Sequence, residues 1–318
     1  MSIHPTRILP EKSPRSFVER SNFRGFFAVS RDWILILCIS ALSIWIHNFF
    51  FYLIAVWAIG SLQFALGESL IHEASHYNLF KTRSWNDRLD FLYALPFWQT
   101  VDQFRTRHSL HHRKLGTAED HIVSDYEAIG LNRPGRNFFW LWFLRPVLGY
   151  GAYFYLGSTS LRPWRSGVKI LVFWAAVIGI FWGMGALSIL LAYWVVPFLW
   201  AYGSFVYWSE VTDHFNSLSG TRSNLNRVSN LVTHNNGYHF LHHRYPSIPW
   251  YRLPAAYRCL CPGEGEISYG FLETYRQLRI SSPAGPERSW QAGGKPALPG
   301  VVPAHAALTE GADFTTFL

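Results

Sequence analysis

Residues 50–76 read FFYLIAVWAIGSLQFALGESLIHEASH, and this stretch decides the fold. An apolar run long enough to cross the ~30 Å hydrocarbon core of a membrane continues without a break into His72 and His76. Residues four apart share one face of a helix, so Glu68, His72 and His76 form a single stripe. The stretch therefore predicts a membrane-spanning helix whose end carries two histidines on one side.

Two long apolar tracts, each about twice the length of one span, predict four spans at 33–48, 50–71, 168–184 and 186–208. Hydrophobic residues make up 49% of the 318 residues and charged residues 15%, well below the roughly 25% of soluble domains. We therefore predict an all-α integral membrane protein with four transmembrane helices in two hairpins. A cytosolic helical cap is expected to carry the histidines.

The distribution of charge predicts the orientation. The chain has 28 lysines and arginines. All but Lys169 lie before the first predicted span, between the second and third spans, or after the fourth. Positive residues favour the cytoplasmic side, so both termini and the histidines are expected in the cytoplasm. No basic run is dense enough to predict a nucleic-acid partner, although the net charge is +8. A third apolar stretch, residues 138–157, contains Arg145 and Pro146, which favours an interfacial or re-entrant helix pair over a fifth span.

Nine of the 14 histidines fall into groups with helical spacing. Imidazole is a good ligand for iron, copper, nickel and zinc, and nine imidazoles exceed what one ion binds, so we predict two metal ions. Isolated histidines such as His47 and His121 are interpreted as ordinary residues. The candidate ligands are His72, His76, His108, His111, His112, His214, His239, His242 and His243.

Two other interpretations stay open. His72-Glu73-x-x-His76 matches the zinc metalloprotease pattern, in which Glu73 would be the base, but a protease has no use for two H-x-x-H-H groups. A non-catalytic metal-binding or transport protein would bind metal without consuming oxygen. The predicted spans lack the paired midspan charges of transport pathways.

The third histidine group extends from Asn236 to Pro254 and reads NGYHFLHHRYPSIPWYRLP. Together with the other two groups, it resembles the membrane fatty acid desaturase/hydroxylase superfamily over about residues 30–260. The resemblance implies a membrane desaturase-like domain over 33–260, preceded by a cytosolic segment 1–32. A C-terminal cytosolic helix over 261–280 and a disordered tail over 281–318 are expected to follow.

The resemblance also implies the chemistry. The nine histidines carry over as ligands of two non-haem iron ions that use O2, and Glu68, Glu210 and His234 are candidates for contacting the ligands. The expected function is desaturation of a fatty acyl chain. Alternatives are hydroxylation, which shares every step but the last, and desaturation of a smaller non-lipid metabolite. The substrate is expected to enter from the bilayer, because the predicted site lies at the cytoplasmic border of the membrane.

Electrons must come from a separate ferredoxin or cytochrome-type donor with its reductase, because the cysteines cannot hold an iron–sulfur cluster. The basic residues Arg105, Arg107, Arg113 and Lys114 could dock such an acidic carrier, or could simply be cytoplasmic charges. The acidic residues beside the second histidine group could serve a polar head group or form a solvated loop. These are Asp102, Asp120, Asp125 and Glu127.

Overall fold

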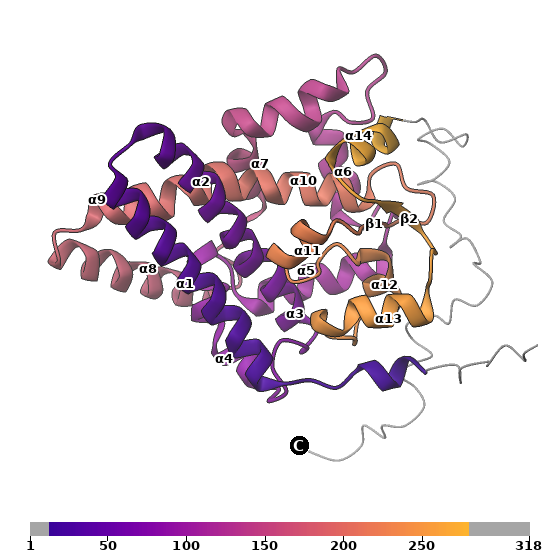
Figure 1. Ribbon diagram of the computed structural model, residues 1–318, viewed down its shortest axis with the longest axis horizontal. Coiled ribbons are helices and arrows are strands. Elements are labelled where there is room, and N and C mark those ends of the chain that lie inside the picture. The colour runs from indigo at the N-terminus through magenta and orange to yellow at the C-terminus, as the bar shows by residue number, and fades with distance from the viewer. Residues whose placement is uncertain (1–12, 280–318) are drawn as a thin grey trace, which may run out of the picture.

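The computed structural model describes residues 13–279 and is built almost entirely from helices (Figure 1). The expected tail over 281–318 lies outside the described residues. Four continuous helical segments are long and apolar enough to cross a membrane: Asn22–Ile46, Phe49–Ser75, Trp164–Gly183 and Leu187–His214. The all-α class and the four spans are therefore confirmed. The stretch 138–157 is not among these candidate spans.

The first two spans are α1 (Asn22–Ile46) and α2 (Phe49–Phe64), which pack side by side (Figure 1). The turn between them follows from two residues. His47 adopts the left-handed conformation at φ 50°, and the side chain of Asn48 accepts a hydrogen bond from the backbone N–H of Phe51 at 3.0 Å. A π-helical turn, Ala65–Leu70, then leads into α3 (Ile71–Ser75), so the second span ends within the first histidine group.

The third and fourth spans are α8 (Trp164–Gly183) and the segment that runs from α9 (Leu187–Leu190) to α10 (Gly203–His214). Two π-helical turns, Leu191–Val195 and Phe198–Tyr202, join α9 to α10. Large apolar side chains on α1 and α8 face outward, as Leu37 and Trp182 do with exposed fractions of 63% and 73%. Contact with lipid tails explains this exposure, which would be unfavourable in water.

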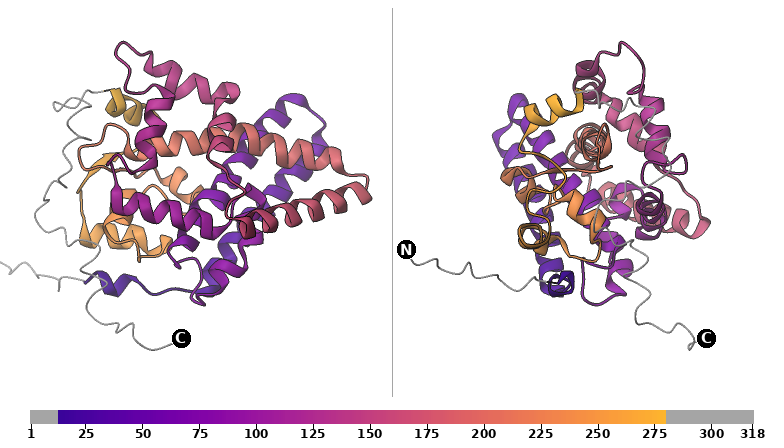
Figure 2. Two further views of the ribbon diagram at one scale, coloured as in Figure 1. Left: turned by 180° about the vertical axis from the view of Figure 1, so that it is seen from behind. Right: turned by 90° about the vertical axis from the view of Figure 1, so that its right-hand side faces the viewer.

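The remaining elements gather at one end of the spans (Figures 1 and 2). They are α4 (Trp85–Arg88), α5 (Val101–Lys114), α6 (His121–Ile129), α7 (Gly151–Ser158), β1 (Arg222–Asn224), α11 (Arg227–Val232), α12 (His239–Arg244), α13 (Leu253–Leu260), β2 (Glu266–Ser268) and α14 (Phe271–Arg279). Short 3-10 turns cover Pro14–Phe17, Asp90–Leu92, Leu95–Phe97 and Trp250–Arg252, and π-helical turns cover Trp140–Leu144 and Pro146–Tyr150. The two strands form a small parallel pair with Arg222 opposite Glu266.

Several boundaries differ from those expected from the sequence. The helix that contains the first predicted span begins at Asn22, before residue 33, because the side chain of Ser21 caps it by accepting a hydrogen bond from the backbone N–H of Arg24 at 3.4 Å. The fourth span continues to His214 rather than ending at residue 208. The region 261–280 is not one helix, since strand β2 precedes α14.

Candidate metal centre

The nine candidate histidines lie on four helical segments that meet at one end of the second and fourth spans. His72 lies in α3 and His76 is the residue that ends it, while His214 is the last residue of α10. The second group, His108, His111 and His112, lies on α5, and the third group, His239, His242 and His243, lies on α12. The side chain of Thr100 and the amide of Gln103 cap the first turn of α5 and fix where that helix starts.

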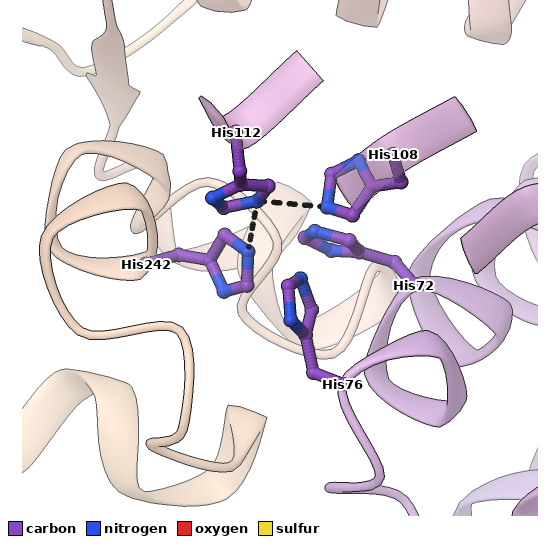
Figure 3. Close-up of side chains that lie close together, drawn as sticks. All are labelled: His72, His76, His108, His112 and His242. Atoms are coloured by element: carbon purple, nitrogen blue, oxygen red, sulfur yellow. Dashed lines mark hydrogen bonds between the residues drawn. The ribbon is translucent and has the colours of Figure 1, made fainter. Parts of the chain in front are cut away.

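Five of the rings point toward one another (Figure 3), and we call them the five-histidine cluster: His72, His76, His108, His112 and His242. One ring nitrogen from each lies within 4.8 Å of the others. The Nε2 atom of His112 is 2.9 Å from that of His108 and 3.2 Å from that of His242. Three segments far apart in the sequence thus supply one compact set of ligand atoms.

The other four rings form a second set, the four-histidine cluster: His111, His214, His239 and His243. The Nε2 atom of His214 lies 3.1 Å from that of His111 and 2.9 Å from that of His239. Rings of the two clusters contact each other, since His112 stacks on His243 with centroids 4.1 Å apart. The two sets are therefore neighbours, and α5 and α12 each contribute to both.

A simple rule divides the histidines between the clusters. On α5, His108 and His112 are four residues apart and enter the five-histidine cluster, while His111 enters the other. On α12 the assignment is reversed, because His239 and His243 enter the four-histidine cluster and His242 enters the first. Histidines four apart share one helix face, and the second histidine of each H-x-x-H-H motif, His111 or His242, belongs to the neighbouring cluster.

The tautomers of two histidines show that the four-histidine cluster fits a cation. His111 donates from Nδ1 to the carboxylate of Asp120 at 3.0 Å, and His214 donates from Nδ1 to the carbonyl of Gly220 at 2.9 Å. In the neutral rings, both Nε2 atoms then carry lone pairs, and these face each other at 3.1 Å. Two nitrogens about 2.1 Å from one ion at a right angle are about 3.0 Å apart, which matches this approach.

Buried histidine nitrogens without a hydrogen-bond partner also indicate that the clusters fit a metal ion. The Nε2 atoms of His72, His76 and His243 are buried and have no hydrogen-bond partner among the described residues. Burial lowers the pKa of His108, His112 and His242 well below its usual value, and neighbouring imidazoles lower it further. These rings are therefore neutral, which is the form that binds metal. Both clusters could hold a metal ion, as the sequence predicts.

A chamber of about 120 Å³ opens beside the clusters. Its walls include His72, His108, His111, His214 and His239, so histidines from both clusters face it. Its other walls include three acidic residues and one arginine: Glu68, Glu210, Asp213 and Arg107. The hydroxyl of Tyr202 donates to Glu68 at 2.8 Å, whereas the Oε1 atom of Glu210 is buried without a partner. Glu68 and Glu210 thus lie beside the histidines, as the sequence predicts.

A larger cavity of about 490 Å³ shares the side chains of Phe64, Ser209, Asp213 and Asn236 with this chamber. Aromatic rings line one part of it, including Trp142, Phe205, Trp208 and Phe271. Amides and hydroxyls line another part, among them Asn224, Ser229 and Thr274. We call the two spaces the inner chamber and the outer cavity.

His234, the third residue expected to contact the ligands, lies elsewhere. Its Nε2 atom is 2.7 Å from Asp32 and 2.9 Å from Arg31, both on α1. Arg31 also donates to the carbonyls of Leu231 and Val232 at 2.7 Å. Within the described residues, His234 belongs to neither cluster. It joins the loop before the third histidine group to the first span.

The position of Glu73 weighs against the protease interpretation. Its carboxylate accepts a hydrogen bond from the backbone N–H of Trp250 at 3.0 Å, and among the described residues it is in no metal-binding group. A general base has to reach the metal-bound water that it activates. Glu73 instead holds the turn that follows the third histidine group.

Four residues near the site have contacts that the sequence did not reveal. His121 was expected to be ordinary, yet it lines the inner chamber and lies close to Asp125 and Glu210. Asp120 orients His111, and Arg107 lines the chamber rather than only an outer basic surface. Arg105, also assigned to that surface, donates to the carbonyl of Ser75 at 2.9 Å. The adjacent residues Asp120 and His121 are the feature of the sequence that could have predicted their place beside the site.

Fold and site together define a class: a helical membrane protein with two adjoining histidine clusters that could each hold a metal ion. The family model for fatty acid desaturases matches residues 19–268, so the chain belongs to the fatty acid desaturase family. The resemblance seen in the sequence is thereby confirmed.

The chain is also similar to two characterised proteins. It is 25% identical over 278 residues to the dihydrorhizobitoxine desaturase of Bradyrhizobium elkanii, and this alignment covers 78% of each chain. It is 26% identical over 205 residues to the beta-carotene ketolase of a Paracoccus species, and this alignment covers 58% of this chain and 71% of the ketolase. The family and both relatives support an oxidoreductase.

Proposed function

We propose that this protein is an O2-dependent desaturase with two non-haem iron ions, one in each histidine cluster. The arrangement of nine imidazoles in sets of five and four carries the proposal. Iron bound there would supply the oxidising power, which amino-acid side chains lack, to activate O2 against an unactivated C–H bond. Overall, the substrate loses two hydrogen atoms, the donor supplies two electrons with two protons, and O2 becomes two waters.

The residues of the chain hold and orient this centre. Asp120 and the carbonyl of Gly220 fix the tautomers of His111 and His214, so that Nε2 faces inward in each ring. A substrate carbon in the inner chamber would lie beside both clusters, and the apolar walls of the chamber, Phe64, Phe104 and Val206, would help to exclude water.

Hydroxylation is the second candidate, and the ketolase relative favours it, because its name describes insertion of oxygen into a C–H position. The desaturase relative matches more of this chain, so we place desaturation first. The expected fatty acyl substrate stays a prediction. Desaturation of a smaller non-lipid metabolite stays the alternative.

We further propose that both termini and the clusters face the cytoplasm, and that a separate ferredoxin or cytochrome-type protein supplies electrons. The asymmetry of positive charge supports this orientation. Arg113 remains exposed on α5, close to both clusters along that helix, and is the residue of the basic group best placed to meet an acidic donor.

The test is product analysis by mass spectrometry after expression in a host, with His242→Ala as the inactive variant. A desaturase yields a product lighter than its substrate by two hydrogen atoms, and a hydroxylase yields one heavier by an oxygen atom. His242→Ala should insert in the membrane at the wild-type level and form no product. Undiminished product from His242→Ala would overturn the proposal.

A further inference from the structure

The short helix α11 lies against the first span. Arg31 on α1 donates hydrogen bonds to the backbone carbonyls of Leu231 and Val232, both at 2.7 Å. These two bonds hold the end of α11 beside α1 (Figure 1). An arginine inside a span commonly pairs with backbone carbonyls in this way. The position of Arg31 along α1 therefore gives the depth of α11 relative to the membrane.

The first span sets that depth. Trp45, near the end of α1, and Trp182, near the end of α8, are both exposed, as tryptophans are at the edge of a bilayer. Arg31 lies 15 residues before Ile46, the last residue of α1, which is about 22 Å along the helix. The hydrocarbon core is about 30 Å thick. Helix α11 is therefore at the depth of the leaflet on the side of the clusters and not in the water beyond it.

The surface of α1 on either side of α11 faces lipid. Phe27, Arg31 and Ile34 follow one another at spacings of four and three residues, so they share one face of α1. Phe27 and Ile34 are both exposed, and lipid tails explain the exposure of such side chains on a span. Helix α11 is attached between them, so its own outer surface continues the surface that lipid covers.

The outward side chains of α11 are apolar, as this position requires. Val228 and Leu231 are three residues apart on one side of the helix and are 70% and 71% exposed. Phe271 and Leu272, at the start of α14, are exposed as well. A group of large apolar side chains in water would be unfavourable. We call these four residues the apolar rim.

The apolar rim borders the outer cavity. Val228 and Phe271 are exposed at the surface and also line that cavity, so they mark its mouth. Asn226 donates to the carbonyl of Tyr269 at 2.9 Å, which joins the start of α11 to the segment before α14. The ring of Phe271 stacks on Trp142 with centroids 4.6 Å apart. Packing therefore holds the mouth in place, and its edges are apolar.

The charge beside the rim suits a phospholipid. Arg227, the first residue of α11, is exposed and forms no ion pair within the described residues. A long cationic side chain covers apolar surface with its stem and extends its charge to the level of the head groups. A lipid phosphate would supply the partner that Arg227 lacks.

We propose that the apolar rim inserts into the leaflet on the side of the clusters, so that the outer cavity opens to lipid rather than to water. The groups that contact the rim are the acyl chains of the surrounding phospholipid. A molecule dissolved in this leaflet then enters the outer cavity sideways, between α11 and α14, without crossing water. The inference goes beyond the proposed function, because it holds whichever reaction the clusters carry out.

Fluorescence quenching in phosphatidylcholine vesicles tests the depth of the rim. The full chain carries one bimane-labelled cysteine at a time, at Val228→Cys, Leu231→Cys or Phe271→Cys, in a variant whose own cysteines are replaced by serine. Bromine on the lipid chains quenches a label that contacts lipid, and iodide quenches a label in water. Two native cysteines, each kept alone, are the matched controls: Cys38, exposed on α1, and Cys259, exposed on α13.

The labels at the three rim positions should lose as large a fraction of their emission in brominated lipid as the label at Cys38. They should also be far less sensitive to iodide than the label at Cys259. Val228 and Leu231 are exposed, so their replacement should leave the packing intact, and circular dichroism checks that each variant is folded.

Two results would overturn the inference. Rim labels that iodide quenches as it does at Cys259, with no effect of brominated lipid, would place the mouth in water. Rim labels that neither quencher reaches would mean that protein covers the mouth, either a second copy of the chain or another partner.

Discussion

At the scale of single residues, Asp120 links the local fold to the candidate metal centre. Its carboxylate accepts from Nδ1 of His111 at 3.0 Å and from the backbone N–H of Gly116 at 3.0 Å, and it caps the start of α6. One side chain therefore fixes a loop, a helix end and a histidine tautomer. Such outer contacts commonly change metal affinity by about 10- to 100-fold.

Replacement of Asp120 by asparagine keeps the size and the helix cap but removes the negative charge beside His111. We expect metal affinity in the four-histidine cluster to fall by about tenfold or more, with little loss of folding stability. Chelator competition followed by elemental analysis measures this affinity, and the unfolding midpoint is the control. Wild-type affinity in Asp120→Asn would contradict the assigned role.

Acidification should destabilise the metal-free protein, because buried neutral histidines take up protons only on unfolding. Burial, with a smaller contribution from Arg105, lowers the pKa of His76 to about 4 from its usual 6.5. The stability from this group is fully present above pH 6.5 and is lost as the pH falls toward 4. For His76 alone this amounts to about 3 kcal/mol.

Urea unfolding of the metal-free protein between pH 7 and pH 4 measures this slope. His76→Gln should flatten it, whereas His47→Asn, a change at an exposed turn position that tolerates asparagine, should not. A stability that does not change over this range would show that the histidines titrate in the folded protein.

At the scale of elements, close packing between helices sets the position of α10, which carries Glu210 and His214. Gly203 on α10 lies against Gly151 on α7, and a Cβ atom added at Gly203 would come within 2.8 Å of the backbone of Gly151. Backbone atoms cannot move aside as a flexible side chain does. The two glycines therefore let α7 and α10 approach closely enough to place the fourth span.

Gly203→Val should push α10 away from α7 and lower the free energy of unfolding by about 1–3 kcal/mol. We also expect less metal in the four-histidine cluster, since His214 ends the displaced helix. Gly179→Val on α8 is the matched control, because an added Cβ there meets nothing within 4 Å. Equal thermal stability and metal content in the two variants would refute this account of the packing.

The sequence predicts the parts of the site that depend on local spacing and leaves out those that depend on packing. His108, His111 and His112 are recognisable as ligands from their motif alone. The division of the nine histidines into five and four depends on how α5 faces α12, which spacing does not encode. Hydropathy placed the first span at residue 33, because it cannot anticipate that Asp32 pairs with His234, far along the chain. Spacing likewise does not show that Arg107 lines the inner chamber.

At the scale of the whole molecule, the four spans hold the clusters at one end, and the charge asymmetry supports our proposal that this end faces the cytoplasm. Cys259 is exposed on α13, at the end of the molecule where the clusters lie, and Met184 is exposed in the turn between α8 and α9. In a variant that keeps Cys259 alone, a membrane-impermeant maleimide should label the protein only after the cells are permeabilised. A cysteine introduced by Met184→Cys should react in intact cells. The reverse pattern would contradict the orientation.

The central claim is that the molecule gathers nine imidazoles around two iron ions. The amount of each metal per chain, measured by elemental mass spectrometry on the active, detergent-purified protein, tests it most directly. The account predicts two iron ions per chain. Active protein with less than one iron per chain, or with zinc in place of iron, would contradict it.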